Sequence, residues 1–487
     1  MLELRAVRYR YPGFGRWAID GLDLAVGDGE IVGLTGPNGA GKSTLCLVAA
    51  GVAPGSIGGE LDGEVLLDGQ ALGGRRHQLA GSIGLVFSNP DAQRTRIAAT
   101  VFEEVAFGPM NMGLSVAETV ARARRALVGL GIDHLAERNP GRLSGGETQL
   151  VAIASILAME PRHLVLDEPV AELDPEGRGL VAEALRRIAP HGTGILVAEH
   201  DLDLLSGLGS RIVEIEDGRI VPGARDAAEL PTAATAAAVP VDAPIAIRCS
   251  GLAFEYPDGT RALDGVDLSI RAGETVAIVG RNGSGKTSLV RTWIALLRPA
   301  AGRLEIAGRS TDGRRVAELA RVVGLTFQNP HDQLFGRTCH DEVAFGARNV
   351  GLRGRDLDAA VGEALTAVGL NDAAATNPFD LGPSRQRLLA IASVLAMRTP
   401  IVVLDEPTMG LDLDERARVQ SIVGRLASEG RTVVAISHDP RFVASSFSRA
   451  IQLDHGRVVR DGPPTQQDAG TGVRPSAGAR ASEGASG

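Results

Sequence analysis

The sequence predicts an α/β protein made of two similar domains in tandem, each with a mostly parallel sheet covered by helices. Three observations support this fold class. Apolar strand-like runs alternate with helical patterns in both halves. A glycine-rich loop follows one of these runs in each half. The motifs of residues 9–200 return in the same order in residues 254–438, an internal duplication whose period is too long for a solenoid.

The glycine-rich loops match the phosphate-loop pattern G-x-x-x-x-G-K-[ST] at residues 36–44 and 280–288. The apolar runs 31–35 and 275–279 precede them as strands, and a helix is expected after each loop. At such a turn the backbone N–H groups and the helix N-terminus face a polyphosphate, the lysine reaches its outer phosphates, and the hydroxyl binds Mg²⁺. The recurrence argues against a chance glycine-rich turn. The residues expected to bind a nucleoside triphosphate are Gly36, Asn38, Gly39, Gly41, Lys42, Ser43, Thr44, Gly280, Asn282, Gly283, Gly285, Lys286, Thr287 and Ser288.

Lys42 and Lys286 of these loops are the only two lysines in the chain, because every other Lys-or-Arg position holds arginine. Lysine offers a compact point charge on a flexible stem, which the planar guanidinium of arginine does not. The sequence therefore predicts two triphosphate sites.

Charge and cysteine content exclude several classes of protein. The net charge of −9 and the pI of about 5.6 argue against a nucleic-acid binder with a broad basic surface. The three cysteines have no metal-ligand spacing and are too few for a disulfide framework, which suits a reducing compartment. No signal region opens the sequence, and no apolar run approaches the roughly 20 residues of a membrane helix. We expect a soluble protein whose membrane role, if any, needs a partner.

The repeat also predicts the domain boundaries. We expect one domain at residues 1–221 and a second at residues 245–461. Residues 222–244 are rich in Ala and Pro and are expected to form a linker. Residues 462–487 are rich in Gly, Ser, Ala and Pro and are expected to form a disordered tail. The linker is long enough to let the halves pair within one chain, and pairing between two chains stays open.

An acidic pair ends an apolar strand in each half, as Asp167–Glu168 and as Asp405–Glu406. In a triphosphate site the first carboxylate helps to hold Mg²⁺, and the second can polarise the attacking water. Such a pair is a weak signal alone, but here it follows a phosphate loop twice.

A third motif, Ser144-Gly145-Gly146, precedes a helical run in the first half. A hydroxyl, bare backbone N–H groups and a helix N-terminus together form an anion cradle. An ordinary helix cap is the alternative interpretation.

Together these motifs resemble the nucleotide-binding domains of ABC ATPases, and the resemblance covers nearly all of both halves. It implies two P-loop NTPase domains, each with a small antiparallel β part beside the parallel core. It also implies a helical subdomain in each half, which includes residues 115–137 and 355–370. In that family two domains clamp two ATP molecules head to tail. Each site joins the phosphate loop of one domain to the signature helix start of the other, with ATP and Mg²⁺ as the implied cofactors.

The resemblance also implies roles for individual residues. Tyr11 and Tyr256 would stack on adenine, and a strand tyrosine facing the core is the alternative. Gln328 would bridge Mg²⁺, the attacking water and the helical subdomain. The general bases implied are Glu168 and Glu406, and the γ-phosphate contacts are His200 and His438. The metal ligands implied are Ser43, Thr287, Gln328, Asp167 and Asp405, and the signature contacts are Ser144, Gly145 and Gly146.

The sequence departs from the family pattern at two places. Ser88 stands where the family has glutamine, and its shorter side chain lacks the same reach. An ungapped alignment of the halves puts Gly382-Pro383-Ser384 opposite the Ser-Gly-Gly motif. Gly382 then lacks the hydroxyl, Pro383 lacks a backbone N–H, and Ser384 adds a side chain at a close approach. A one-residue gap would instead place Ser384 opposite Ser144.

Under the head-to-tail rule both departures fall in the composite site of the first phosphate loop. We therefore expect one hydrolytic site, built from the second phosphate loop and the first signature. The other site would bind ATP and turn over slowly, although it retains Glu168 and need not be inactive.

Residues 89–93 and 104–108, with their repeats at 329–333 and 342–346, resemble the ATPases that energise energy-coupling-factor importers of vitamins and transition metals. The resemblance implies an ATPase at the cytoplasmic face of the cell membrane. Its partners would be a transmembrane component and a substrate-binding membrane component. A sugar-importer ATPase is one alternative. A soluble ABC protein acting on ribosomes or DNA is another, and the acidic charge and unpaired cysteines count against it.

Overall fold

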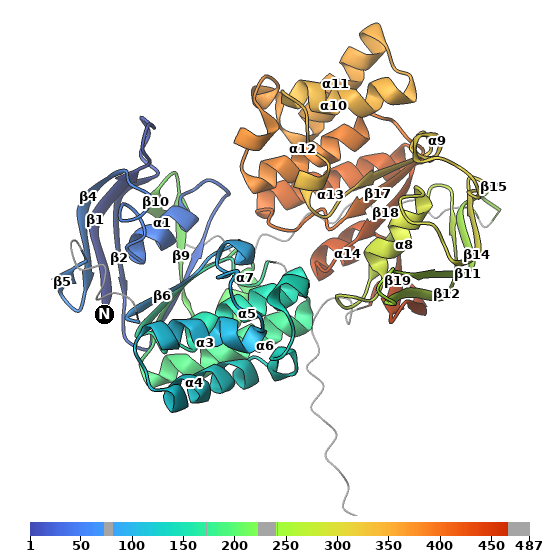
Figure 1. Ribbon diagram of the computed structural model, residues 1–487. Helices are drawn as coiled ribbons and strands as arrows, with labels where there is room; N and C mark the ends of the chain where they lie inside the picture. Colours follow the sequence, from blue (N-terminus) through green and yellow to red (C-terminus); the bar gives the residue numbers. More distant parts are fainter. Residues whose placement is uncertain (73–80, 172, 223–239, 241, 466–487) are drawn as a thin grey trace, which may run out of the picture.

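The computed structural model describes residues 1–487 apart from 73–80, 172, 223–239, 241 and 466–487. Two lobes of the same architecture arise, one from each half of the chain (Figure 1). Each lobe contains a six-stranded sheet, a four-stranded antiparallel sheet and a set of helices.

The strands of the first lobe are β1 (Leu2–Arg10), β2 (Ile19–Val26), β3 (Ile31–Thr35), β4 (Glu60–Leu67), β5 (Gln70–Ala71), β6 (Ile83–Val86), β7 (His163–Asp167), β8 (Gly194–Ala198), β9 (Arg211–Glu216) and β10 (Arg219–Val221). Its α-helices are α1 (Lys42–Ala49), α3 (Val101–Asn111), α4 (Val116–Gly129), α5 (Gly145–Leu157), α6 (Pro175–Ile188) and α7 (Leu202–Gly207).

The strands of the second lobe are β11 (Ile245–Glu255), β12 (Arg261–Arg271), β13 (Thr275–Val279), β14 (Ala301–Ile306), β15 (Arg309–Ser310), β16 (Val323–Thr326), β17 (Ile401–Asp405), β18 (Thr432–Ile436), β19 (Arg449–Asp454) and β20 (Arg457–Gly462). Its α-helices are α8 (Lys286–Trp293), α9 (Val316–Leu319), α10 (Cys339–Val350), α11 (Gly354–Val368), α12 (Pro383–Leu395), α13 (Leu413–Ser428) and α14 (Pro440–Ser446).

The six-stranded sheets have the same strand order, β10-β9-β3-β8-β7-β6 in the first lobe and β20-β19-β13-β18-β17-β16 in the second. Neighbouring strands are parallel except at the β9–β10 and β19–β20 edges. Every residue of β7, β8, β13, β17 and β18 is buried. Parallel strands covered on both faces read as near-continuous apolar runs, which explains why the sequence revealed them.

The carboxyl ends of the parallel strands carry the chemistry-bearing residues. The phosphate loop follows β3, the acidic pair closes β7, and His200 follows β8. Because β3, β7 and β8 are parallel neighbours, these groups meet at one edge of the sheet, where ligands bind in open α/β sheets. The second lobe repeats the arrangement with β13, β17 and β18.

The helices α3, α4 and α5 form one packed group, and α10, α11 and α12 form its repeat. In Figure 1 helices α3 and α4 lie at the lower side of the molecule, whereas α10 and α11 lie at the upper side. Each phosphate loop also hydrogen-bonds to the opposite lobe, through Asn38 to Asp412 and through Asn282 to Asp174, so the two lobes face each other head to tail.

The structure confirms the predicted fold class. Strands β3 and β13 have the bounds expected from the apolar runs before the phosphate loops, and α4 and α11 occupy most of the stretches assigned to the helical subdomains. The domain boundaries stay predictions. The expected tail from residue 466 and most of the expected linker (223–239 and 241) lie outside the described residues. Among the described residues, no helix is long and apolar enough to cross a membrane.

Candidate nucleotide-binding sites

Each phosphate loop joins a central strand to a helix, β3 to α1 in the first lobe and β13 to α8 in the second. Gly41 and Gly285 precede these helices with φ of 107° and 100°. A Cβ at the two positions would lie 2.6 Å from the carbonyl oxygen of Ala18 and 2.3 Å from that of Ala262. Glycine is required at both positions, because only glycine combines this backbone conformation with so close an approach.

The two lysines lie inside their own loops. Lys42 Nζ donates to the carbonyl oxygens of Gly36 and Pro37 at 2.8 and 2.9 Å. Lys286 Nζ makes the same two contacts within the second loop, at 2.7 and 2.9 Å. Burial lowers the pKa of both lysines. Both ammonium groups are thus held at the loop, where phosphate oxygens can replace the carbonyl partners.

The first carboxylate of each acidic pair faces the hydroxyl of the phosphate loop. Ser43 Oγ donates to Asp167 Oδ1 at 3.0 Å. Burial raises the pKa of Asp167 and of Asp405 to about 6. Hydrogen bonds from Ser43 to Asp167 and from Thr287 to Asp405 act in the opposite direction and lower the pKa. Asp405 Oδ1 is buried and has no hydrogen-bond partner among the described residues. A hydroxyl beside a carboxylate is a donor set that suits Mg²⁺, and the unpartnered oxygen fits such an ion.

The second carboxylate of each pair faces the histidine that follows the next strand. Oε1 of Glu168 and of Glu406 lies 3.3 Å from Nε2 of His200 and of His438, respectively. Both glutamates have a left-handed backbone, with φ of 48° and 49°. Non-glycine residues hold such a conformation only where the surrounding structure imposes it. The matched geometry gives each lobe a carboxylate and an imidazole that face each other at 3.3 Å.

The environments of the two glutamates nevertheless differ. Burial raises the pKa of Glu406 to about 8 and lowers the pKa of His438 to about 3, the latter with help from the charge of Lys286. Burial also opposes ionisation of Glu168, but the facing His200 and the charge of Lys42 bring its pKa below the ordinary value.

A cavity of about 930 Å³ lies where the second phosphate loop faces the first lobe. Its lining combines predicted residues of both lobes. From the second lobe these are Tyr256, Asn282, Gly283, Gly285, Lys286, Thr287, Ser288, Gln328, Asp405, Glu406 and His438. From the first lobe they are Ser144, Gly145, Gly146, Glu168 and His200. We call this cavity the open site.

The first phosphate loop instead contacts the second lobe directly. Asn38 N donates to Asp412 Oδ2 at 2.8 Å, and Asn38 Nδ2 donates to Glu415 Oε2 at 2.7 Å and to the Gly410 carbonyl at 3.1 Å. The cavity here has only about 30 Å³, and Gly36, His200 and Asp412 contribute to its lining. We call this region the closed site.

The equivalent contact at the open site is weaker. Asn282 N donates to Asp174 Oδ2 at 3.4 Å, and Arg281 forms an ion pair with Glu176. The first loop is therefore held to the opposite lobe by more and shorter hydrogen bonds than the second.

The signature helices begin differently in the two lobes. Ser144 caps α5 in a capping box, accepting from Glu147 N at 3.3 Å while Glu147 Oε2 accepts from Ser144 N at 2.8 Å. Gly382 occupies the same position before α12 without a side-chain cap, and Pro383 is the first helical residue. The two helices have equal length, so the ungapped alignment is the one that the structure follows. Ser384 lies inside the helix.

The two tyrosines lie beside the helices that follow the phosphate loops. Tyr11 Oη is 3.1 Å from Thr44 Oγ1, and Tyr256 Oη is 3.0 Å from Ser288 Oγ. Both rings are partly exposed. Tyr256 lines the open site, whereas the lining of the closed site does not include Tyr11.

Two interface residues were missed by the sequence reasoning. Asp174 and Asp412 cap helices α6 and α13 and accept hydrogen bonds from the opposite phosphate loop. The signal was available, because both follow their acidic pair at the same interval. Ser88, expected to lack reach, does hydrogen-bond to Asp167, so it contacts the metal-ligand candidate of its own lobe.

Known proteins share these features. The family model described as ABC transporter matches residues 19–171 and again residues 263–409. A protein of Methanosarcina acetivorans, provisionally named an ABC transporter ATP-binding protein, is 35% identical over 480 residues, which cover 95% of this chain and 90% of that protein.

Solved structures are similar as well. The archaeal ribosome recycling factor aABCE1, solved with the ribosomal stalk protein aP1, matches 94% of this chain and 90% of its own with a TM-score of 0.65 and 21% identity. The cbiO1 protein of Clostridium perfringens, part of the complex cbiONQ, matches 46% of this chain and 91% of its own with a TM-score of 0.42 and 30% identity. The chain belongs to the ABC transporter family as a tandem ATP-binding subunit that hydrolyses ATP.

Proposed function

We propose that this chain is the ATPase subunit of an importer that carries a vitamin or a transition-metal ion across the cell membrane. The subfamily is supported by the Asn-Pro-x-x-Gln and Glu-Val-Ala-Phe-Gly stretches in both halves. The ATPase would lie at the cytoplasmic face, bound to a transmembrane component and a substrate-binding membrane component. A sugar importer would use the same chemistry with other partners.

The open site carries the proposal, because it joins one phosphate loop to the signature of the opposite lobe. We infer that ATP binds there with its phosphates on the second loop and the helix start at Ser144. Thr287, Asp405 and Gln328 would hold Mg²⁺, which neutralises charge on the phosphates. Ser43 and Asp167 would do so in the other lobe. Glu406 in its ionised form would accept a proton from the attacking water, and His438 would contact the γ-phosphate.

We further propose that hydrolysis is concentrated at the open site. Three features support this asymmetry. The signature at the open site has a serine hydroxyl and two glycines. The lobe that supplies its phosphate loop also supplies Gln328, and its cavity has room for a nucleotide. The closed site would pair its phosphate loop with the start of α12 at Pro383, which donates no N–H, and Asn38 of that loop bonds to the carboxylate of Asp412. Each hydrogen bond lost to a charged phosphate costs about 1.5–3 kcal/mol.

Exposed apolar side chains on the helical regions support a partner of low polarity. Phe335, Phe345 and Phe379 are 58%, 48% and 50% exposed, and the first two rings meet edge to face at 4.7 Å. Clustered exposed aromatic rings are typical of interaction surfaces. These side chains lie outside the lining of the open site, so they can serve docking without serving hydrolysis.

Affinity purification from native membranes tests the importer function. The tagged full-length chain is extracted in mild detergent, and the proteins that accompany it are identified by mass spectrometry. We expect small multispanning proteins, one of them carrying a bound ligand that identifies the substrate. Ribosomal or DNA-repair proteins without a membrane partner would overturn the proposal and favour a soluble function.

A matched variant sharpens the experiment. Phe335→Asp with Phe345→Asp places two charges on the aromatic pair, and we expect it to lose the membrane partners while the ATPase rate of the purified chain stays unchanged. Arg337→Asp, a charge change on the adjoining loop, serves as the control and should keep the partners. Equal recovery of membrane proteins with both variants would contradict docking at the aromatic pair.

A further inference from the structure

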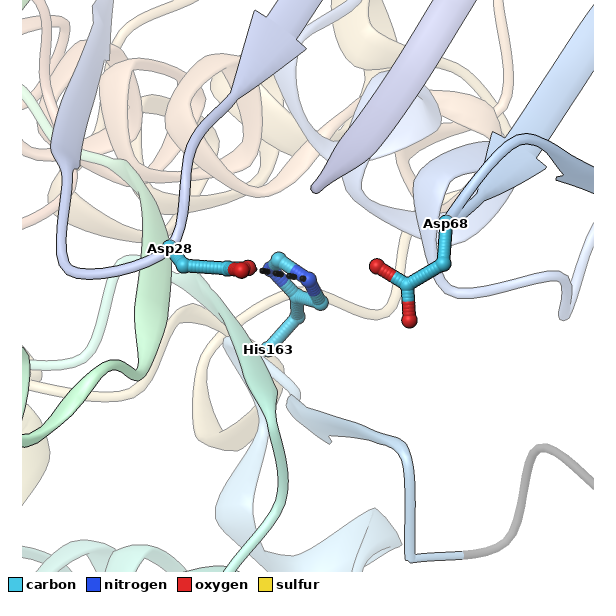
Figure 2. Close-up of side chains that lie close together, drawn as sticks. All are labelled: Asp28, Asp68 and His163. Atoms are coloured by element: carbon cyan, nitrogen blue, oxygen red, sulfur yellow. Dashed lines mark ion pairs between the residues drawn. The ribbon is translucent and has the colours of Figure 1, made fainter.

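Three potential metal ligands meet in the first lobe, away from both phosphate loops. Asp28 lies in the turn between β2 and β3, Asp68 in the turn after β4, and His163 is the first residue of β7. One ligand atom of each lies within 4.8 Å of the other two. Figure 2 shows the imidazole between the two carboxylates. Since β7 rises about 3.3 Å per residue, the cluster is separated by the length of the strand from Asp167.

The histidine of this cluster lacks the partner that its burial demands. His163 is 1% exposed, and neither ring nitrogen has a hydrogen-bond partner among the described residues. Its Nε2 lies 3.6 Å from Asp28 Oδ1. Buried polar groups nearly always have a hydrogen-bond partner in native proteins. We therefore expect a ligand to bind the imidazole at this point.

The second lobe shows that the fold does not need these side chains. The start of β17 has Ile401 in place of the histidine, and the turn after β14 has Ala307 in place of Asp68. Asp68 and Ala307 share a left-handed backbone, with φ of 50° and 49°. The turn between β12 and β13 has Ala272 where the first lobe has Asp28. All three ligand candidates are thus specific to the first lobe.

The carboxylates already attract positive charge. The Met1 ammonium lies 3.0 Å from Asp28 Oδ1 and 2.7 Å from Asp68 Oδ1, and Arg162 donates to Asp68 Oδ2 at 2.8 Å. Neither group donates to the imidazole of His163. A divalent ion could replace the ammonium between the carboxylates and also bind the imidazole.

We propose that Asp28, Asp68 and His163 bind a divalent transition-metal ion at a site separate from the nucleotides. One nitrogen and two carboxylates suit zinc and its neighbours, whereas Mg²⁺ and Ca²⁺ favour oxygen ligands throughout. Bonds of about 2.0–2.2 Å around a tetrahedral ion place two ligand atoms roughly 3.3–3.6 Å apart. Binding an ion would require the carboxylates to move inward, and their side chains are 53% and 40% exposed. The bound ion would tie the turns of the antiparallel sheet to the central sheet.

Equilibrium binding to the nucleotide-free full-length chain tests the site. The protein is stripped with a chelator and titrated with Zn²⁺ by calorimetry, and Co²⁺ absorption reports the nitrogen and oxygen ligands. We expect one ion per chain, a higher melting temperature with Zn²⁺, and no displacement by Mg²⁺. The variants Asp28→Ala, Asp68→Ala and His163→Ile take the residues of the second lobe, and each should weaken binding at least about tenfold.

A matched control separates the site from surface histidines. His455 is 95% exposed beside Asp454, and His455→Ala should leave Zn²⁺ binding unchanged. Asp28→Ala alters an exposed turn, so it keeps the test decisive if His163→Ile does not fold. Absence of Zn²⁺ binding at micromolar concentration would overturn the proposal, as would equal affinity in the wild type and in Asp28→Ala and Asp68→Ala.

Discussion

The two composite sites differ although they are built on the same fold. At the open site, the second phosphate loop and the capped start of α5 border a cavity of about 930 Å³. At the closed site, Asn38 is hydrogen-bonded to Asp412 and Glu415, and the cavity has a volume of only about 30 Å³. Both loops match the same pattern and both acidic pairs adopt the same geometry. The difference therefore arises from what the opposite lobe presents to each loop, and exchanging residues between the lobes tests it.

Replacing the loop lysines should produce the largest effect. Lys286→Ala removes the charge at the open site, and we expect the steady-state ATPase rate to fall by about 100-fold or more, as when a positioned transition-state donor is lost. Lys42→Ala removes the equivalent group at the closed site and should cost far less. ATPase assays at saturating Mg²⁺ and ATP measure both variants, and the reverse order would break the comparison.

Exchanging the signature residues should have the next largest effect. Gly145→Pro gives α5 the first residue of α12 and removes one N–H from the open site, and we expect a loss of about 10-fold to 100-fold in ATPase rate. The helix tolerates the change, because proline suits the first helical position and Ser144 already has extended backbone angles. Pro383→Gly is the control and should change the rate little. A larger effect from Pro383→Gly would point to the closed site.

A smaller loss is expected when the glutamine is exchanged. Gln328→Ser gives the second lobe the residue that the first has at Ser88, and it should lower the ATPase rate by about tenfold, as expected when one hydrogen bond to a charged group is lost. Ser88→Gln, the reciprocal change, should leave the rate close to that of the wild type, because the closed site contributes little to it. The pair is measured side by side under single-turnover conditions, where a rate gain in Ser88→Gln would show that its site limits hydrolysis.

The smallest effect should come from the loop-to-lobe hydrogen bonds. Asn38→Ala removes the bonds to Gly410 and Glu415, each worth about 0.5–1.5 kcal/mol, and should lower the midpoint of urea unfolding. Asn282→Ala is the matched control, because the hydrogen bond that Asn282 forms across the lobes is donated by its backbone N–H. Equal midpoints for the two variants would show that the side chain of Asn38 does not hold the lobes.

Much of the fold could be predicted from local sequence. The strands β3 and β13 read as runs of mostly apolar residues, with four of the five residues buried in β3 and all five in β13, and the loop pattern that follows predicts a strand-to-helix turn. The helix α1 begins at Lys42, inside the phosphate-loop pattern and not after it, because Gly41 has the left-handed backbone conformation that precedes the helix.

The contacts between the lobes could not be predicted in the same way. The hydrogen bonds of Asn38 to Asp412 and Glu415 depend on how the two lobes dock. Hydrophobic periodicity predicts local helices and strands, but it does not predict the docking of one lobe on the other. The three ligands Asp28, Asp68 and His163 belong to separate turns and a strand, so no spacing in the sequence marks them.

The central claim is that the open site performs most of the hydrolysis, and the two glutamates of the acidic pairs test it most directly. Glu406→Gln and Glu168→Gln both keep the shape of the side chain. The first removes the expected base beside the second phosphate loop, and the other removes the expected base beside the first phosphate loop. The account predicts that Glu406→Gln abolishes most of the ATPase rate while Glu168→Gln retains most of it. Equal losses in the two variants would contradict the asymmetry.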